Sequence, residues 1–340
     1  MKATRKDVAQ RAGVSEQTVS YILNKSRKFS QDVEARVHNA VKELNYVPNM
    51  TAKSLVTNKN YSVSVIVHDI SNPIFNEIMV GFQEAAHEHD YFVTLCDAHH
   101  EIDKYVSNLI ARNTEGVFIY VLAAYDDISF LERFIDCDVK IVLGGNIAIN
   151  KKKISKHVSI IDADHIDGMH QIIDYLADLG HEDIVYLSGI DIHSKLDHRY
   201  HAFHDYYEKV FKRKAQVIEN IAPFDTTPES GYFLAKKLIE SNKPFTALVT
   251  TNDLMAYGVI EYLNEHGIQV PNDVSVIGID DLKFSKYYNP KLTSLGFDKK
   301  MYGKVVFEQL YSMIHLLSDV KDVRIQTTLI KRESCKKIST

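Results

Sequence analysis

The run DVAQRAGVSEQTVSYILN, from Asp7 to Asn24, most strongly constrains how the chain can begin to fold. Ala9 stands where two helices would touch, Gly13 where a tight turn would occur, and Val19 where a second helix would face inward. Two helices that cross closely around a short turn need residues of these kinds at this spacing. The run therefore predicts a helix-turn-helix.

Local signals define the ends of these helices. Thr4 and Asp7 have the spacing of a capping box, and Ser15 is suited to cap the second helix. A third helix is expected from Ser30 to about Asn45, because apolar residues recur there at helical spacing. We expect the three helices to enclose a small core.

The second helix would then turn polar side chains outward near its N-terminal end. Gln17 can pair with adenine, Glu16 can accept from cytosine, and the hydroxyl groups of Ser15 and Thr18 can reach phosphate oxygens. An ordinary solvated helix face is the alternative interpretation. The candidate DNA contacts in the head are Thr4, Ser15, Glu16, Gln17, Thr18, Ser20, Tyr21 and Asn24.

The segment YVPNMTAKSLVTN, residues 46–58, follows the third helix. Pro48 would stop the preceding helix and Asn49 could cap a short new one. About eight residues are too few for a stable isolated helix, so we expect it to order only when a partner holds it. On DNA its candidate contacts are Asn49, Ala52, Lys53 and Leu55, with Leu55 as a wedge in a minor-groove step. A plain linker is the alternative.

Charge is unevenly distributed along the chain. Residues 1–60 hold eleven Lys and Arg against five Asp and Glu, a formal charge of +6, so the remainder must carry −11 to give the total of −5. A basic head on an acidic body indicates a polyanionic partner at the head. The beginning of the chain has no apolar stretch typical of a signal peptide, and no segment is long enough to span a membrane. We therefore expect a cytoplasmic protein.

From about Tyr61 onward, short apolar strands alternate with amphipathic helices, and the alternation begins again after Ser159. This pattern predicts two doubly wound parallel α/β sheets, one in each of two lobes, as in periplasmic binding proteins. We expect a helix-turn-helix domain at 1–47, a hinge helix and linker at 48–60, and a two-lobed core at 61–340.

Polar side chains stand at the expected carboxyl ends of several strands, where such sheets bind ligands. Asp69 and Asp280 follow apolar strand-like runs, Asn252 follows ALVTT, and Arg199 opens a helix. Such planar bidentate groups, with an aromatic face beside them, suit a neutral hydroxyl-rich ligand such as a sugar. The alternatives are structural: Asp280 and Asn252 could cap helices or turns, and Arg199 could pair with Asp197.

Several strings together resemble the LacI-GalR family of bacterial transcriptional regulators, over essentially the whole chain. They are the helix-turn-helix run, YVPNMTAKSL, VHDISNPIFNEIMVGFQEAA, DLGHEDIVYLSG, TNDLMAYGV, VPNDVSVIGIDD and IKRESC. The resemblance implies a ligand-responsive repressor whose second helix reads the major groove, while Leu55 acts as a lever in the minor groove. It also implies a homodimer on a near-palindromic operator of double-stranded DNA.

The resemblance also implies that the chain returns to the first lobe near its end, so that lobe one comprises about 61–160 and 292–322 and lobe two about 161–291 and 323–340. It further implies effector contacts between the lobes. The candidates are Asp69, Phe75, Asn146, Arg199, Phe224, Asn252 and Asp280. Three positions depart from the family pattern. Phe224 is displaced by a couple of residues from the expected place of an aromatic side chain. Tyr21 stands where the family commonly has Arg, and Asn146 stands where many relatives have an acidic residue. The chain has no Trp, so any aromatic face must come from Phe or Tyr. A sugar or glycoside is the favoured effector, and a nucleobase is the alternative.

The sequence indicates no catalytic, cofactor or metal site. No GxxxxGK[ST], GxGxxG, HExxH or GxSxG string is present, and the three cysteines are not in zinc-binding spacing. Two other kinds of function remain as alternatives: a sugar-binding receptor without a role on DNA, and a regulator that responds to a partner protein.

Overall fold

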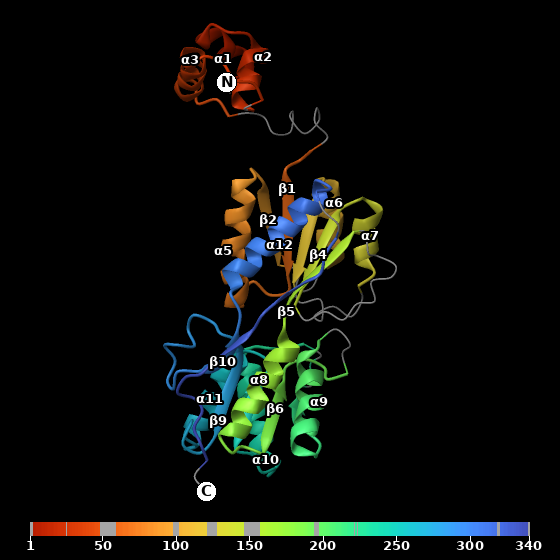
Figure 1. Ribbon diagram of the computed structural model, residues 1–340, viewed down its shortest axis with the longest axis vertical. Coiled ribbons are helices and arrows are strands. Elements are labelled where there is room, and N and C mark those ends of the chain that lie inside the picture. Colours follow the sequence, from red (N-terminus) through yellow and green to blue (C-terminus); the bar gives the residue numbers. More distant parts are fainter. Residues whose placement is uncertain are drawn as a thin grey trace. The chain divides into compact units, whose positions relative to one another are not determined.

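The computed structural model describes residues 3–24, 26–47, 59–97, 102–120, 128–145, 157–193, 197–220, 222, 224–317 and 320–338. The chain divides into two compact units, Met1–Asn60 and Tyr61–Thr340, which are treated separately below (Figure 1). No helix among the described residues is both long and apolar enough to cross a membrane.

The first unit contains three helices, α1 (Arg5–Ala12), α2 (Glu16–Leu23) and α3 (Gln31–Glu43). The expected capping box is present: the Thr4 side chain accepts from the N–H of Asp7, and the Asp7 carboxylate accepts from the N–H of Thr4. Gly13 ends α1 at φ 66°, a left-handed conformation that glycine adopts without steric cost. Val8, Val19 and Val37, one from each helix, are fully buried in the common core.

The first lobe of the second unit is built around a sheet of order β11-β5-β4-β3-β1-β2, in which each strand runs parallel to its described neighbours. One face packs against α5 and α12 and the other against α6 and α7. The strands are β1 (Ser62–Val67), β2 (Phe92–Asp97), β3 (Gly116–Tyr120), β4 (Lys140–Gly144), β5 (Val158–Ala163) and β11 (Val323–Ile325). The helices are α5 (Pro73–Glu88), α6 (Ile102–Ala111), α7 (Phe130–Asp136) and α12 (Lys299–Ile314).

The second lobe repeats the plan with the order β12-β10-β9-β8-β6-β7. Helices α8 and α9 cover one face, and α10 and α11 cover the other. Only β12, among the described strands, runs antiparallel to its neighbour. The strands are β6 (Ile184–Ser188), β7 (Gln216–Glu219), β8 (Ala247–Thr250), β9 (Ser275–Asp280), β10 (Thr293–Gly296) and β12 (Thr328–Ile330). The helices are α8 (His165–Asp178), α9 (Arg199–Phe211), α10 (Pro228–Glu240) and α11 (Asp253–Glu265).

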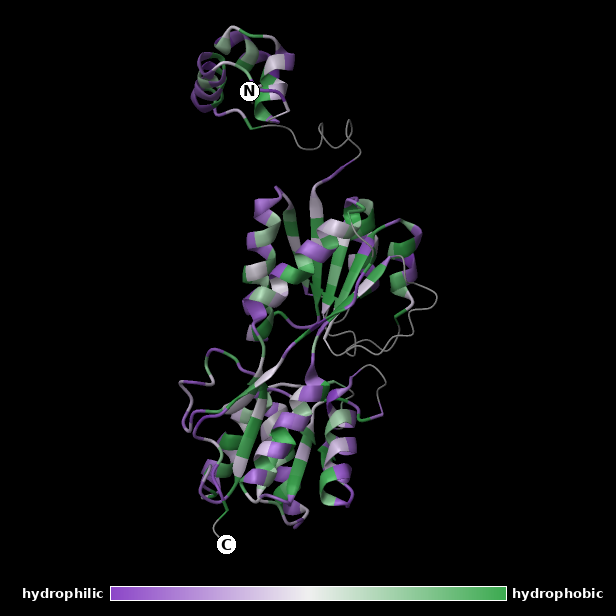
Figure 2. Cartoon of the chain, viewed as in Figure 1, coloured by the Kyte–Doolittle hydropathy of each residue, from purple (hydrophilic) through white to green (hydrophobic). Residues whose placement is uncertain are grey.

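The strands of both sheets are mostly apolar along their length (Figure 2), because helices cover both faces. The predicted fold class is confirmed: a small all-α head and a two-lobed core of doubly wound sheets.

Three segments cross between the lobes: β5 to α8, β10 to α12, and β11 to β12 (Figure 1). The approximate lobe boundaries expected from sequence need correction here. Strand β10 pairs with β9, so lobe two continues to Gly296 and does not end near 291. Strand β11 pairs with β5, so 323–325 belongs to lobe one, which itself continues to Ala163 through β5. These short strands are assigned by their pairing partners, which periodicity cannot reveal.

Helices α5 and α12 approach each other so closely that their backbones nearly touch. A Cβ atom added at Gly81 would stand 1.8 Å from the carbonyl oxygen of Lys300, and one added at Gly303 would stand 2.0 Å from that of Ile78. Such spacing requires glycine on both helices. The two helices therefore form a tightly packed layer over the sheet of lobe one.

Candidate functional site

The exposed part of α2 carries the side chains expected to meet DNA. Glu16 and Gln17 are exposed, whereas Ser20 and Tyr21 are half-buried. Ser15 caps the helix by accepting from the N–H of Thr18 at 3.1 Å. The amide of Gln17 donates to the Tyr21 hydroxyl at 2.9 Å, so these two side chains form one polar unit.

Other predicted contacts of the head already have intramolecular partners. The Glu16 carboxylate lies 3.5 Å from Arg5 of α1, and the Asn24 amide donates to the Ser20 hydroxyl at 3.3 Å. The Thr4 hydroxyl donates to the Asp7 carboxylate at 2.7 Å. The roles proposed for all these residues on DNA stay predictions. Asn49, Ala52, Lys53, Leu55 and Asn146 lie outside the described residues.

The second unit contains a cavity of about 630 Å³, lined by residues of both lobes. It brings together six of the residues predicted from sequence as effector contacts: Asp69, Phe75, Arg199, Phe224, Asn252 and Asp280. The strand-end argument accounts for this convergence, because the carboxyl ends of β1 and β9 both open onto the cavity. Contact with an effector stays a prediction for each of them.

Arg199 is buried and already engaged within the protein. Its Nε and Nη2 donate to the Asp197 carboxylate, with the shortest distance at 2.6 Å, and its Nη1 donates to the carbonyl oxygen of Thr251 at 2.9 Å. Burial alone would raise the pKa of Asp197, but the charge and hydrogen bonds of Arg199 outweigh it and hold that pKa below its usual value. The pairing considered from sequence is thus present, and the hydrogens of Arg199 that remain can serve a ligand.

Asn252 also has a structural role. Its side-chain oxygen accepts from the N–H of Met255 as the N-cap of α11, and its amide nitrogen donates to the carbonyl oxygen of Thr226 at 3.0 Å. One amide hydrogen is left for a ligand. Asp69 also has a structural role, because its carboxylate accepts from both the N–H and the hydroxyl group of Ser71.

Asp280 differs from these residues. Its carboxyl group lines the cavity and has no hydrogen-bond partner among the residues that the structure describes. Burial, reinforced by the charge of Asp253, raises its pKa to about 8. Its backbone lies at φ 107°, which is uncommon for a residue with a side chain. Unsatisfied polarity and backbone strain coincide at this residue, as they do at many functional sites.

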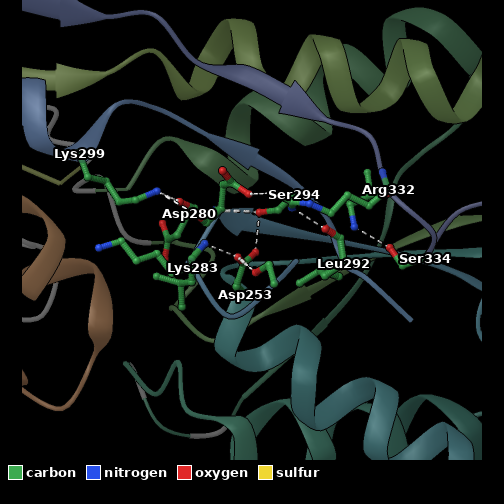
Figure 3. Close-up of polar contacts among 12 residues, drawn as sticks. Asp253, Asp280, Lys283, Leu292, Ser294, Lys299, Arg332 and Ser334 are labelled. Atoms are coloured by element: carbon green, nitrogen blue, oxygen red, sulfur yellow. Dashed lines mark hydrogen bonds and ion pairs between the residues drawn. The ribbon is translucent and has the colours of Figure 1, made fainter. Parts of the chain in front are cut away.

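A buried polar network supports the strand end that carries Asp280 (Figure 3). The Asp253 carboxylate accepts from the hydroxyl groups of Ser285 and Ser294 and from the N–H of Leu282 at 2.8 Å. Burial nevertheless raises the pKa of Asp253 to about 7. Asp281 is held by the N–H···O bond to Ser294 at 2.9 Å and by its ion pair with Arg332.

Aromatic rings face the cavity from both lobes. Phe75 packs edge-on against Tyr120 in lobe one, with ring centroids 5.5 Å apart. Phe224 of lobe two packs edge-on against His68 of lobe one at 4.8 Å. The second contact joins the lobes at the cavity wall, so Phe224 lies where an aromatic face was expected.

Lining residues that were missed at the sequence level include His68, Tyr120 and His165. Tyr120 ends β3, so the strand-end rule would have found it. His165 follows β5, a strand that the observed alternation did not reveal. Among the described residues, no group of three or more His, Cys, Asp or Glu side chains is placed to hold a metal ion.

Two families match parts of the chain. Residues 4–49 match the family of bacterial regulatory proteins named lacI, and residues 173–335 match the periplasmic binding protein-like domain. The chain is 31% identical to the HTH-type transcriptional repressor PurR of Pectobacterium atrosepticum, over 98% of this chain and 96% of that one. It is also 31% identical to PurR of Pasteurella multocida, over 98% and 99% of the two chains.

Solved structures have the same fold. The lac repressor dimer bound to operator and the anti-inducer ONPF superposes with a TM-score of 0.84, at 24% identity over 99% of this chain and all of that one. The complex of the transcriptional regulator CelR with cellobiose gives 0.72, at 24% identity over 98% and 99% of the two chains. The helix-turn-helix head, the two-lobed core with its cavity and the relatives that match the full length of the chain all indicate the same family. The chain belongs to the lacI family of bacterial regulatory proteins, as a DNA-binding transcriptional repressor and not an enzyme.

Proposed function

We propose that this repressor binds a near-palindromic operator as a homodimer, and that a small effector between its lobes controls its affinity for that operator. The observation that carries the proposal is the cavity of about 630 Å³, whose wall includes residues at or beside two of the lobe crossovers, His165 and Asp280. A ligand that favours one arrangement of the lobes would shift the population of the chain toward it.

Three consecutive segments of the chain have separate roles in this proposal. Residues 1–47 read the major groove of one half-site, residues 48–60 form the hinge at the operator centre, and residues 61–340 bind the effector and dimerise. The charge of +6 on residues 1–60 supports the first of these assignments, because phosphate contacts supply much of the affinity for DNA.

A sugar or glycoside is the effector class that we propose. Aromatic rings against its C–H faces and planar polar groups at its rim suit a neutral polyol, and the cavity offers both. A nucleobase is the alternative, because Phe75 and Phe224 come from opposite lobes and a flat ring could lie between them. A panel of free sugars, glycosides, nucleosides and nucleobases separates the two classes by thermal shift, since a ligand of the folded state raises Tm.

Large apolar side chains exposed on the second unit support the dimer. They include Phe92, 72% exposed, Phe284, 63% exposed, and Tyr287, 75% exposed. Such residues commonly mark surfaces that another chain covers. Analytical ultracentrifugation of the full chain checks this part of the proposal, and a monomer at micromolar concentration contradicts it.

The experiment for the DNA-binding part is selection from random duplexes, followed by titration at several salt concentrations. We expect a near-palindromic sequence to be enriched and its affinity to fall steeply as salt rises. A sugar-binding receptor without a role on DNA would enrich nothing. Dependence on an added lysate protein, and on no small molecule, would instead favour control by a partner protein.

Substitutions divide the two activities. Leu55→Ala should weaken operator binding while the response to an effector in thermal shift is unchanged, because only the minor-groove wedge is lost. Arg199→Ala and Asp280→Ala should abolish that response while the basal affinity for the operator is retained. If Leu55→Ala binds the operator with the affinity of the parent, the proposed role of Leu55 as a minor-groove wedge is wrong.

A further inference from the structure

His165 occupies the first crossover between the lobes, directly after the N-cap Asp164 of α8. Its imidazole is buried, and Nδ1 lies 3.1 Å from the carbonyl oxygen of Ala163. A carbonyl oxygen can only accept, so the proton of the neutral ring resides on Nδ1. The ring of Phe297 packs edge-on against the imidazole at 6.4 Å and helps to fix its orientation.

The other nitrogen, Nε2, then carries a lone pair. It has no hydrogen-bond partner among the described residues, and the residue lines the effector cavity. Burial, with the nearby charge of Arg199, lowers the pKa of His165 to about 4. The ring is therefore neutral near pH 7, and Nε2 offers the cavity an acceptor and no donor.

The described groups around the same part of the cavity leave no positive charge unmatched. Asp280 presents a carboxyl group and Tyr120 a hydroxyl group, and neither has a hydrogen-bond partner in the part of the chain that is described. Arg199, the one cation among the described lining residues, has its charge matched by Asp197. A ligand that fills this space must supply a donor to Nε2, because a buried acceptor left unpaired is costly.

We propose that His165 is a specificity-determining hydrogen-bond acceptor of the cavity: the effector places an O–H or N–H donor against Nε2, and anionic effectors such as phosphate esters are excluded. An anion would bring a second acceptor against the lone pair, and no unmatched described cation would compensate for burying its charge. The inference rests on the proposed function, because it takes the cavity as the effector site.

The first test needs no effector. Nitrogen-15 NMR of the histidine side chains of the full-length protein at pH 7, with His165 assigned from its missing signal in His165→Gln, reports which ring nitrogen carries the proton. We expect a neutral ring protonated at Nδ1. A ring protonated at Nε2, or at both nitrogens, would overturn the proposal, because Nε2 could then not accept.

The second test uses pairs of probes that differ by one phosphate group: D-glucose and glucose 6-phosphate, D-ribose and ribose 5-phosphate, adenosine and adenosine monophosphate. Thermal shift of the full-length protein is the readout. We expect a neutral member to raise Tm and its phosphate ester to have little effect. A panel in which only esters raise Tm, or in which no neutral member does, contradicts the proposal.

Variants then locate the effect at Nε2. Gln can place its side-chain oxygen near the position of Nε2, whereas Leu fills a similar volume without an acceptor. The neutral probe should bind His165→Leu at least about tenfold more weakly, and His165→Gln should retain most of its affinity. Equal losses in both variants would indicate a packing role and overturn the proposal. The matched controls are His170→Leu and His170→Gln, on the same helix, where the ring stacks on Tyr206.

Failure of this inference is distinguishable from failure of the proposed function. The NMR and thermal-shift measurements contain no DNA, and the selection experiment contains no effector. A protein that selects an operator but binds only phosphate esters keeps the proposed regulator and removes the role of His165. A protein that binds neutral probes through His165 but selects no operator keeps the role of His165 in ligand binding and removes the proposed regulator.

Discussion

Lys299 donates from Nζ to the backbone carbonyl oxygen of Asp280 at 2.6 Å, which joins the first turn of α12 in lobe one to the cavity residue of lobe two (Figure 3). The same ammonium group donates to the carbonyl oxygen of Asp281 at 2.8 Å. Glu77 of α5 lies 3.9 Å from Lys299 and accepts from the N–H of Lys283 at 3.2 Å. Lobe one therefore holds the turn that carries the Asp280 carboxyl group.

The first prediction concerns that connection. Lys299→Met should lower the free energy of unfolding by about 1–3 kcal/mol, because it removes a buried donor from two carbonyl oxygens and the cationic partner from the Glu77 carboxylate. Lys300→Met is the matched control, since Lys300 pairs with Glu84 on the exposed surface of the same two helices. That change should cost less than about 0.5 kcal/mol. Urea unfolding measures both, and equal costs would contradict the role given to Lys299.

A second prediction concerns the response to pH. Burial raises the pKa of Asp280 from its ordinary value of 3.8 to about 8, so between these values the folded state keeps a proton that the unfolded state has lost. Stability from this group therefore falls as pH rises from about 4 to about 8, by at most about 1.4 kcal/mol per pH unit. Asp280→Asn removes the titration, so its stability relative to the parent should increase over the same range.

Urea unfolding of both proteins at pH 5, 6.5 and 8 checks the sign. His165 is present in both proteins, so its own effect in the acidic part of the range cancels to first order. Arg199, Lys299, Glu77 and Asp253 also face Asp280, and they remain in both. Parallel stability curves would show that the carboxyl group is ionised throughout.

The third prediction concerns the contact between α5 and α12. Gly81→Ala should destabilise lobe one by about 2 kcal/mol or more, because the added methyl group would overlap the carbonyl oxygen of Lys300 and the backbones would have to separate. Gln83→Ala, at an exposed position of the same helix, is the control and should be close to neutral. Thermal unfolding followed by circular dichroism compares the two, and a neutral Gly81→Ala would refute close packing here.

A fourth prediction treats Gln17 and Tyr21 as one reading unit. Tyr21→Phe removes the hydroxyl group that accepts from the Gln17 amide, while the ring can keep its stacking on Phe29. We expect the helix to remain folded and the preferred bases of the operator to change. In a double-mutant cycle with Gln17→Ala, the effects on operator affinity should be non-additive. Additive effects would mean that the two side chains act separately.

Local and periodic features were predictable from the sequence. The spacing of Ala9, Gly13 and Val19 predicted the helix-turn-helix because helix contacts and positive φ depend on neighbouring residues. The alternation of apolar strands and amphipathic helices predicted the two-lobed fold, and the strand-end rule brought Asp69 and Asp280 to one cavity.

The partners of each side chain were decided by the tertiary structure. Strands β10 and β11 contain four and three residues, which is too short for a periodic signal to say which sheet they join. Sequence could propose Arg199 for the cavity, but only the fold shows how it divides its donors between Asp197 and Thr251, 52 residues away. His165 became a candidate when the crossover placed its ring in the cavity wall. Hydrogen bonds are satisfied in space, by groups that chain order does not bring together.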